Sequence, residues 1–130
     1  MAAPVSIPLQ VVAMKCNGAV PANSVVKLDT VEGQVLVTTA ITEFVFGVAQ
    51  NTGATGEMIS VEIGYGAIVK LIATAAIAVG ARVMPGALGR VTTSAGATAV
   101  DCGVALSACS NAGEVVYAVL RPQGLGPVNV

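Results

Sequence analysis

The residue types needed for nucleophilic catalysis are incomplete in this chain. Serine and cysteine are present as candidate nucleophiles, but the 130 residues include no histidine. Catalysis would then need a carboxylate as general base, within hydrogen-bond reach of the nucleophile. The carboxylates are instead spread over separate predicted strands and turns, at Asp29, Glu32, Glu43, Glu57, Glu62, Asp101 and Glu114. A small hydrolase is disfavoured, and we predict that the protein is not an enzyme and has no catalytic residues.

The cysteines do not predict a metal or cofactor site. Cys16, Cys102 and Cys109 are an odd number, they lack the spacing of metal ligands, and no histidine can complete a site. We expect reduced, partly buried thiols. The sequence therefore predicts no metal, no cofactor and no small-molecule substrate.

One tetrapeptide resembles a modification site. Ala13-Met14-Lys15-Cys16 is similar to the Ala-Met-Lys-Met hairpin that carries biotin in acyl-carrier domains, which are also duplicated β structures. In that family the lysine lies at the tip between the two repeats. Here Lys15 precedes both copies, and the junction Gly64-Tyr65-Gly66-Ala67 contains no lysine. Because the motif lacks its structural context, we expect no biotin carrier.

Two glycine clusters could be mistaken for phosphate-binding loops. Gly53 with Gly56, and Gly64 with Gly66, have close glycine spacing, but a phosphate loop needs a helix that begins directly after it. We predict no helix at either place. The clusters are better explained as turns between strands.

The composition favours association with other protein. Hydrophobic residues make up 55% of the chain and charged residues only 10%, against about 25% in ordinary soluble domains. So few charges cannot cover a surface at the usual density, although small neutral residues could cover it without association. The four aromatic residues, expected to be core or interface anchors, are Phe44, Phe46, Tyr65 and Tyr117.

Charge and hydropathy argue against two other classes of partner. The net charge is −1 and no basic run is present, so we expect no direct binding of nucleic acid. The most apolar stretch, 71–81, is shorter than the roughly 20 residues that span a bilayer, and Lys70 and Arg82 flank it. The first ten residues lack the charged and apolar regions of a secretory signal. We expect no membrane partner and a cytoplasmic site of synthesis.

The second half of the sequence repeats the first. At a shift of 56, identical residues pair as Ala19/Ala75, Ala22/Ala78, Gly33/Gly89, Val35/Val91, Thr42/Thr98, Gly47/Gly103, Val48/Val104 and Ala49/Ala105. At a shift of 57 the repeat continues with Gly56/Gly113 and Glu57/Glu114, which we interpret as a shared turn. The sequence therefore predicts a duplicated β unit whose halves share one core.

Short β-branched runs, cut by Gly, Pro, Asn and Asp, predict an all-β barrel or sandwich. The strands are expected near 9–15, 25–29, 34–38, 44–50 and 58–63, and again near 67–72, 81–85, 90–93, 101–107 and 114–121. An Ala-rich stretch, 68–79, could be helical by propensity, but its repeat partner contains Asn17, Gly18 and Pro21, so we predict strand plus loop with at most a helical turn at 74–77.

The predicted organisation is one domain with two extended ends. Residues 1–8 form an extended N-terminal arm because two prolines disfavour strand pairing. Residues 9–121 form a single compact β domain of two repeats, about 14–63 and 70–120. Residues 122–130 form an irregular C-terminal tail, because Pro122, Gly124, Gly126 and Pro127 disfavour a strand there.

From Val20 to Arg121 the chain resembles the decoration, or cement, proteins of tailed-bacteriophage capsids, a family of small duplicated β proteins. The motifs that carry the resemblance are Pro21-Ala22-Asn23-Ser24-Val25-Val26, Phe46-Gly47-Val48-Ala49, Ala78-Val79-Gly80-Ala81-Arg82-Val83, Cys102-Gly103-Val104-Ala105, Gly113-Glu114 and Val119-Leu120-Arg121. Family members commonly have a charged or aromatic residue where this chain has Met84-Pro85.

The resemblance implies a structural virion protein that binds the outer surface of the capsid and bridges subunits of the major capsid protein. Trimers would suit the three-fold positions of an icosahedral shell, so a homotrimer is expected. The residues expected to contact the capsid or a neighbouring copy lie in the arm and at its end, at Pro4, Val5, Ile7, Pro8 and Leu9. The alternative is a cellular self-assembling shell or adaptor protein, since low charge favours association with other protein but does not identify the partner.

Overall fold

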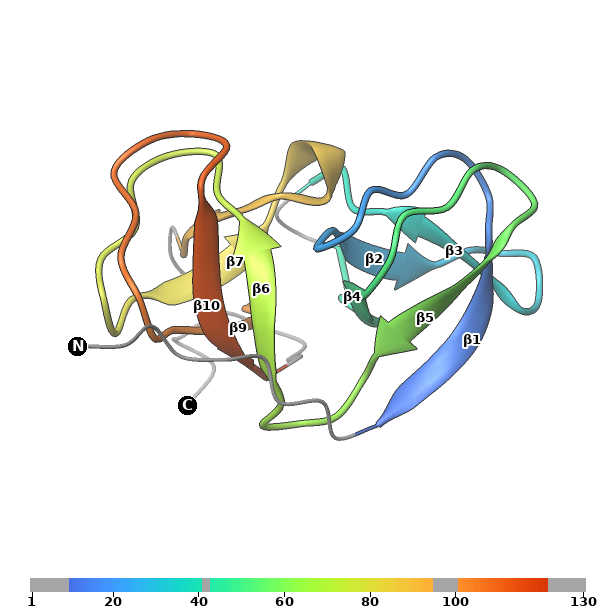
Figure 1. Ribbon diagram of the computed structural model, residues 1–130, viewed down its shortest axis with the longest axis horizontal. Coiled ribbons are helices and arrows are strands. Elements are labelled where there is room, and N and C mark those ends of the chain that lie inside the picture. The colour runs from blue at the N-terminus through green and yellow to red at the C-terminus, as the bar shows by residue number, and fades with distance from the viewer. Residues whose placement is uncertain (1–9, 41–42, 95–100, 122–130) are drawn as a thin grey trace.

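The computed structural model describes residues 10–40, 43–94 and 101–121. Within these residues the chain forms two five-stranded units that lie side by side, with a short 3-10 turn between them at the top of Figure 1. The first unit contains β1 (Val11–Cys16), β2 (Val25–Leu28), β3 (Gln34–Val37), β4 (Gly47–Ala49) and β5 (Met58–Glu62). The second contains β6 (Ile68–Ile72), β7 (Arg82–Pro85), the 3-10 turn η1 (Ala87–Gly89), β8 (Val91–Thr93), β9 (Gly103–Ala105) and β10 (Val115–Leu120).

Both units have the same strand order. The first is a closed barrel in the order β1-β3-β2-β4-β5, and the second is a sheet in the corresponding order β6-β10-β9-β7-β8. The barrel closes through a parallel pairing of β1 with β3, in which Lys15 pairs with Gln34 and Cys16 with Val35. In the second unit the corresponding closure is one parallel bridge between Ala73 and Val91. The all-β fold built from a duplicated unit is confirmed.

The strand registers correct the repeat alignment. The shift is 57 from β1 and β2 to β6 and β7, becomes 56 for β3 and β4, and returns to 57 for β5. The pairings of Ala19 with Ala75 and of Ala22 with Ala78 were therefore wrong, because the bridge of Val20 to Gly53 corresponds to that of Ile77 to Cys109. Alanines are too common in these loops for an identity to fix the register.

Each predicted strand overlaps an observed strand, because glycine and proline turns separate short runs of β-branched residues. The Ala-rich stretch is strand and loop, as predicted. No helical turn forms at 74–77; Ile77 there makes a β-bridge. Among the described residues the one helical turn is η1. It lies in the loop between β7 and β8, which is one residue shorter than the equivalent loop between β2 and β3.

The hydrophobic interior consists of two clusters. The smaller cluster fills the first barrel around Val26, Val35 and Val61. The larger cluster fills the second unit but also takes Val25 and Val48 from the first. The sequence predicted one core shared by the two repeats. In the structure the larger cluster contains residues of both repeats, whereas the smaller cluster contains residues of the first repeat.

A polar contact joins the two units beside η1. Thr38 is fully buried, its carbonyl oxygen accepts the Gly89 N–H at 3.0 Å, and its hydroxyl donates to the Gly86 carbonyl at 3.0 Å. Gly89 has φ +69°, and a Cβ at this position would lie 2.9 Å from the Cβ of Ser24. Only glycine allows this close approach, so the second hairpin is held tightly against the first unit.

The domain boundaries stay a prediction. The arm 1–8 and the tail 122–130 lie outside the described residues.

Equivalent glycines let strands approach closely in both repeats. A Cβ on Gly47 would lie 2.4 Å from the Glu62 carbonyl oxygen, and a Cβ on Gly103 would lie 2.4 Å from that of Val119. Both contacts involve backbone, which cannot give way without moving a strand.

We expect Gly103→Ala to lower the free energy of unfolding by about 2 kcal/mol, because the added methyl group overpacks β9 against β10. The matched control is Gly86→Ala, whose Cβ would meet its nearest neighbour, the Arg90 carbonyl oxygen, at 3.6 Å. The control should change stability by less than about 0.5 kcal/mol. Chemical denaturation measures both, and equal stability of the two variants would contradict the expectation.

Candidate functional site

The predicted contact residues, Pro4, Val5, Ile7, Pro8 and Leu9, lie outside the described residues, so their contacts stay a prediction. The structure does describe the backbone from which they extend. The Gln10 N–H donates to Glu62 Oε2 at 2.9 Å, and the Gln10 carbonyl accepts the Ile63 N–H at 2.9 Å. Glu62 Oε2 also accepts the Gly64 N–H at 2.7 Å. This fully buried carboxylate therefore fixes residue 10 beside the junction of the repeats.

Most carboxylates are engaged by neighbouring backbone or side chains. Glu57 accepts the Ala54 N–H at 2.6 Å, and its repeat partner Glu114 accepts those of Ser110 and Asn111 at 2.7 and 3.0 Å. The shared turn predicted for these glutamates is confirmed.

Three further carboxylates form hydrogen bonds or ion pairs with nearby groups of the chain. Glu43 accepts the Thr39 N–H and pairs with Lys27. Asp101 accepts the Ser94 hydroxyl at 2.7 Å and lies 3.6 Å from Arg82, and Asp29 accepts the Thr30 N–H at 2.7 Å. These groups stabilise turns and loops. Among the described residues one serine hydroxyl, that of Ser94, is bonded to a carboxylate, and the other oxygen of that carboxylate, Asp101 Oδ2, lies beside Arg82.

The buried thiols are poor nucleophiles. Burial and the negative charge of Asp101 raise the pKa of Cys102 to about 12. Burial, followed by the charge of Glu57, raises the pKa of Cys16. All three cysteines are free and Cys109 is half-buried, in agreement with the prediction. Since the thiolate is the reactive form, the raised pKa values lower the reactivity of Cys16 and Cys102.

The structure also tests the predictions made from the Lys15 tetrapeptide and the glycine clusters. Lys15 lies within β1, paired with Met58 on one side and Gln34 on the other, and not at a hairpin tip. Gly56 and Gly66 have φ of +88° and +91° in turns that lead into strands, as predicted. No group of three His, Cys, Asp or Glu in the described ranges could hold a metal ion. No described helix is long and apolar enough to cross a membrane.

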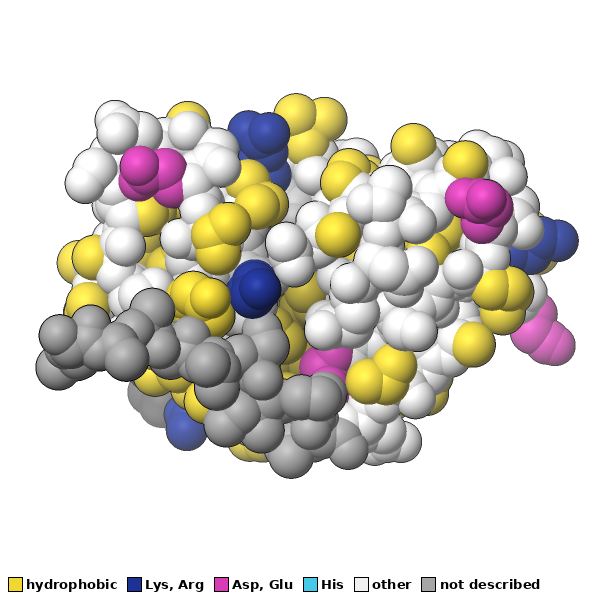
Figure 2. Space-filling view, in the orientation of Figure 1, with side chains coloured by type: hydrophobic (Ala, Val, Ile, Leu, Met, Phe, Trp, Pro, Cys, Tyr) yellow, Lys and Arg dark blue, Asp and Glu magenta, His cyan; other side chains and the backbone are white. Residues whose placement is uncertain are grey.

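Large apolar side chains are exposed instead of reactive groups. Figure 2 shows hydrophobic side chains spread over the visible face, with few charged groups between them. The most exposed are Phe44 at 69%, Leu88 at 68%, Val79 at 66% and Tyr65 at 64%. Isolated cases are normal on protein surfaces, but this number on a weakly charged surface is typical of a protein that associates.

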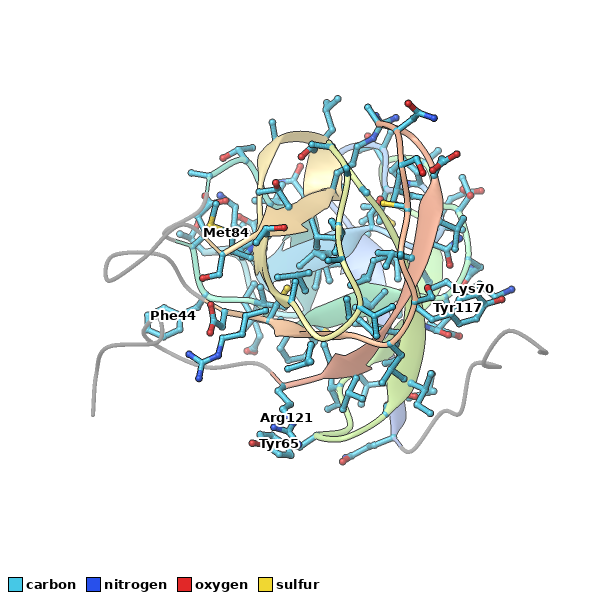
Figure 3. All side chains as sticks on the ribbon, turned by 90° about the vertical axis from the view of Figure 1, so that its left-hand side faces the viewer. Phe44, Tyr65, Lys70, Met84, Tyr117 and Arg121 are labelled. Carbon is cyan, nitrogen blue, oxygen red and sulfur yellow. The ribbon has the colours of Figure 1, made fainter. Side chains whose placement is uncertain are left out.

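Two of the exposed features include aromatic residues. A hollow of about 390 Å³ is lined by Lys27, Leu28, Glu43, Phe44, Val45 and Phe46. In the second unit Tyr117 pairs in register with Lys70, and Figure 3 places Tyr65 and Arg121 at one end of the molecule. Aromatic and cationic side chains together are characteristic of protein interfaces. The sequence identified Phe44 and Tyr65 as possible interface anchors, and both are exposed.

A second hollow, of about 340 Å³, lies between the repeats and includes Leu88. Sequence reasoning missed it because its walls come from loops and strands that are far apart in the chain. The sequence feature that could have indicated this hollow is the dipeptide Leu88-Gly89, because it stands at a hairpin turn where Asn-Gly is more common.

Comparison with known proteins adds two findings. A family model described as phage cement protein matches residues 9–120. The solved head fiber gp8.5 N base in bacteriophage phi29 has a similar fold, with a TM-score of 0.70 at 18% identity, over 91% of this chain and 98% of that one. No curated protein matches the chain.

The turn carboxylate Glu114 should make stability depend on pH. The N–H groups of Ser110 and Asn111 lower the pKa of Glu114 below its ordinary 4.5. A lowered folded pKa means that the ionised group stabilises the fold above the unfolded pKa, and that this contribution is lost as the pH falls through the folded pKa. We expect Glu114→Gln to reduce the denaturation midpoint at pH 7, with the difference from wild type closing as the pH falls below about 4. Glu32→Gln is the control, since the Glu32 carboxylate accepts no hydrogen bond among the described residues. A difference for Glu114→Gln that is the same at pH 7 and pH 3 would argue against this role.

Proposed function

Because the chain belongs to the family of phage cement proteins, we propose that it binds the outer surface of a bacteriophage capsid and stabilises the shell by bridging neighbouring major capsid protein subunits. The family match, over residues 9–120, carries this proposal, since it covers both repeats. The family is one of structural phage proteins and not a class of enzymes. In this proposal the protein is made in the host cytoplasm and acts as a homotrimer on the virion.

The exposed surface suits binding better than turnover. Lys15, Lys70, Arg90 and Arg121 form no ion pair within the described residues, whereas nearly all carboxylates are engaged within the chain. The free charges are therefore mostly positive, and they lie among exposed apolar and aromatic side chains. Such a surface can bury apolar area while it pairs with acidic groups of a capsid subunit.

The arm is the proposed bridging element. The first described residue after the arm, Gln10, is fixed at the repeat junction by Glu62, so in this proposal the arm is attached near a defined point. Val5, Ile7 and Leu9 alternate and would present apolar side chains on one face of an extended segment. Pro4 and Pro8 restrict the free arm and so reduce the entropy lost when it binds.

An extended arm can bind a neighbour by strand addition. In the described residues, β6 pairs with β10 on one side, while its other side is bridged only beyond its end, at Ala73. An edge of this kind offers unpaired backbone groups to an incoming strand. Each arm contact is small, but repetition of the contact over a symmetric shell gives avidity and opposes separation of the capsid subunits.

Deletion of residues 1–8 should abolish binding to expanded capsids of the same phage while the circular dichroism and thermal midpoint stay unchanged. The control is deletion of residues 1–3, which keeps every predicted contact residue and should preserve binding. Cosedimentation with capsids measures both variants. Undiminished binding after deletion of residues 1–8 would show that the described body, and not the arm, makes the contact.

A further inference from the structure

The hollow between the repeats is a groove with a composition suited to a peptide segment. It has a volume of about 340 Å³, and loops and strands of both units form its walls. The lining residues are Ala19, Pro21, Ser24, Val37, Ile72, Leu88 and Arg90. Every one of them is a described residue. The groove is mostly apolar, with the guanidinium of Arg90 as its one charged group.

Leu88 stands at this groove in an unusual conformation. It has φ +62° and ψ +20°, it is followed by Gly89 at φ +69°, and the Arg90 N–H donates to the Ala87 carbonyl at 3.2 Å. Two positive φ values define a type I′ turn, whose first position usually holds Asn, Asp or Gly. A leucine at this position is unfavourable locally, and 68% of it is exposed. Neither turn preference nor burial within its own chain explains the leucine, so a contact outside the chain is indicated.

Arg90 is available for an ionic contact. Its backbone groups complete the turn, but its guanidinium forms no ion pair or side-chain hydrogen bond with the described residues. Because an arginine beside apolar surface favours a carboxylate partner, the occupant should carry an acidic group next to an apolar one.

The corresponding hairpin of the first repeat has this chemistry. Its turn, Val31 to Gln34, is closed by the Gln34 N–H on the Val31 carbonyl at 3.3 Å. Val31 is 53% exposed, and Glu32 is the one carboxylate of the seven, all described, that forms no hydrogen bond or ion pair. The hairpin cannot fill the groove of its own chain, since Val37 lines the groove and Glu32 lies beyond the far end of β3.

We propose that Val31 and Glu32 of one copy dock into the groove between the repeats of the next copy, with Val31 against Leu88 and Glu32 beside Arg90. The contact is head-to-tail, so repetition closes a ring or extends a filament. A ring of three would be the homotrimer of the proposed function, on which this part of the inference rests. One turn in one groove is smaller than a stable interface, which needs about 1,000 Å². The contact therefore determines which surfaces of neighbouring copies meet, and it is strengthened when the capsid holds the copies close together.

Charge reversal tests the ionic half of the contact. Glu32→Arg and Arg90→Glu should each weaken self-association about tenfold, and the double variant should return to within about threefold of wild type. Sedimentation velocity over a range of protein concentrations measures this. Val79→Arg combined with Arg90→Glu is the control, because Val79 is exposed and lies outside the groove, and it should show no recovery. Equal weakening by the single and the double variants would overturn the pairing of Glu32 with Arg90.

Cysteine cross-linking tests the geometry. In a Cys109→Ser background, a Val31→Cys chain mixed with a Leu88→Cys chain should form a disulfide dimer under mild oxidation. A Val79→Cys chain mixed with the Leu88→Cys chain is the control, since Val79 is 66% exposed but lies outside the groove. Both mixtures are tested in concentrated solution and on capsids. No excess of the 31–88 adduct over the control in either setting would overturn the proposal.

The two proposals can fail separately. Leu88→Asn restores the usual turn residue, so it should raise the thermal midpoint while it reduces self-association. If Leu88→Asn and the charge variants bind capsids and self-associate as well as wild type does, the groove contact is wrong and the cement function stands. If the 31–88 adduct forms but wild type never binds capsids, the groove contact stands and the cement function is wrong.

Discussion

The contact of Thr38 with the second hairpin is the interaction on which the arrangement of the molecule depends. A fully buried threonine uses its carbonyl oxygen for the Gly89 N–H and its hydroxyl for the Gly86 carbonyl, so both polar groups are satisfied inside the protein. This pair of hydrogen bonds holds the hairpin of the second repeat against the first unit. Beside this contact the second unit closes less completely than the first, since Ala73 and Val91 form one bridge in place of the two parallel pairs of the first barrel.

The engagement of carboxylates within the chain explains how a weakly charged protein obtains a surface for association. Glu57 and Glu114 hold turns, and Glu62 is buried and accepts the N–H of Gln10, the first described residue of the chain. Burial removes the charge of Glu62 from the surface, whereas Glu57 and Glu114 stay exposed but are bonded to N–H groups of their own turns. Exposed apolar side chains and cations without an ion pair in the described residues remain on the surface, which is the composition that protein interfaces favour.

The sequence predicted the local structure well because local chemistry determines it. Glycines such as Gly33 and Gly113 adopt positive φ at turns, and β-branched residues fill the strands between them. The register was less predictable, since alanine identities in loops carry little information. The contact of Thr38 with Gly86 and Gly89 was not predictable at all, because it joins residues about 50 positions apart and depends on how two finished units pack. The groove beside Leu88 follows from that packing and was missed for the same reason.

The duplication separates what the fold requires from what it does not. Some positions that the backbone constrains hold the same residue in both repeats, as with Gly47 and Gly103 at close strand contacts. Equivalent hairpin turns differ instead, with Glu32 and Gln34 in one repeat and Leu88 and Arg90 in the other. A solvated turn gains nothing in stability from a left-handed leucine, so its presence requires an explanation outside the single chain. Two copies of one unit that carry complementary chemistry at the same turn can join molecules head to tail, which a single unit with identical turns could not do.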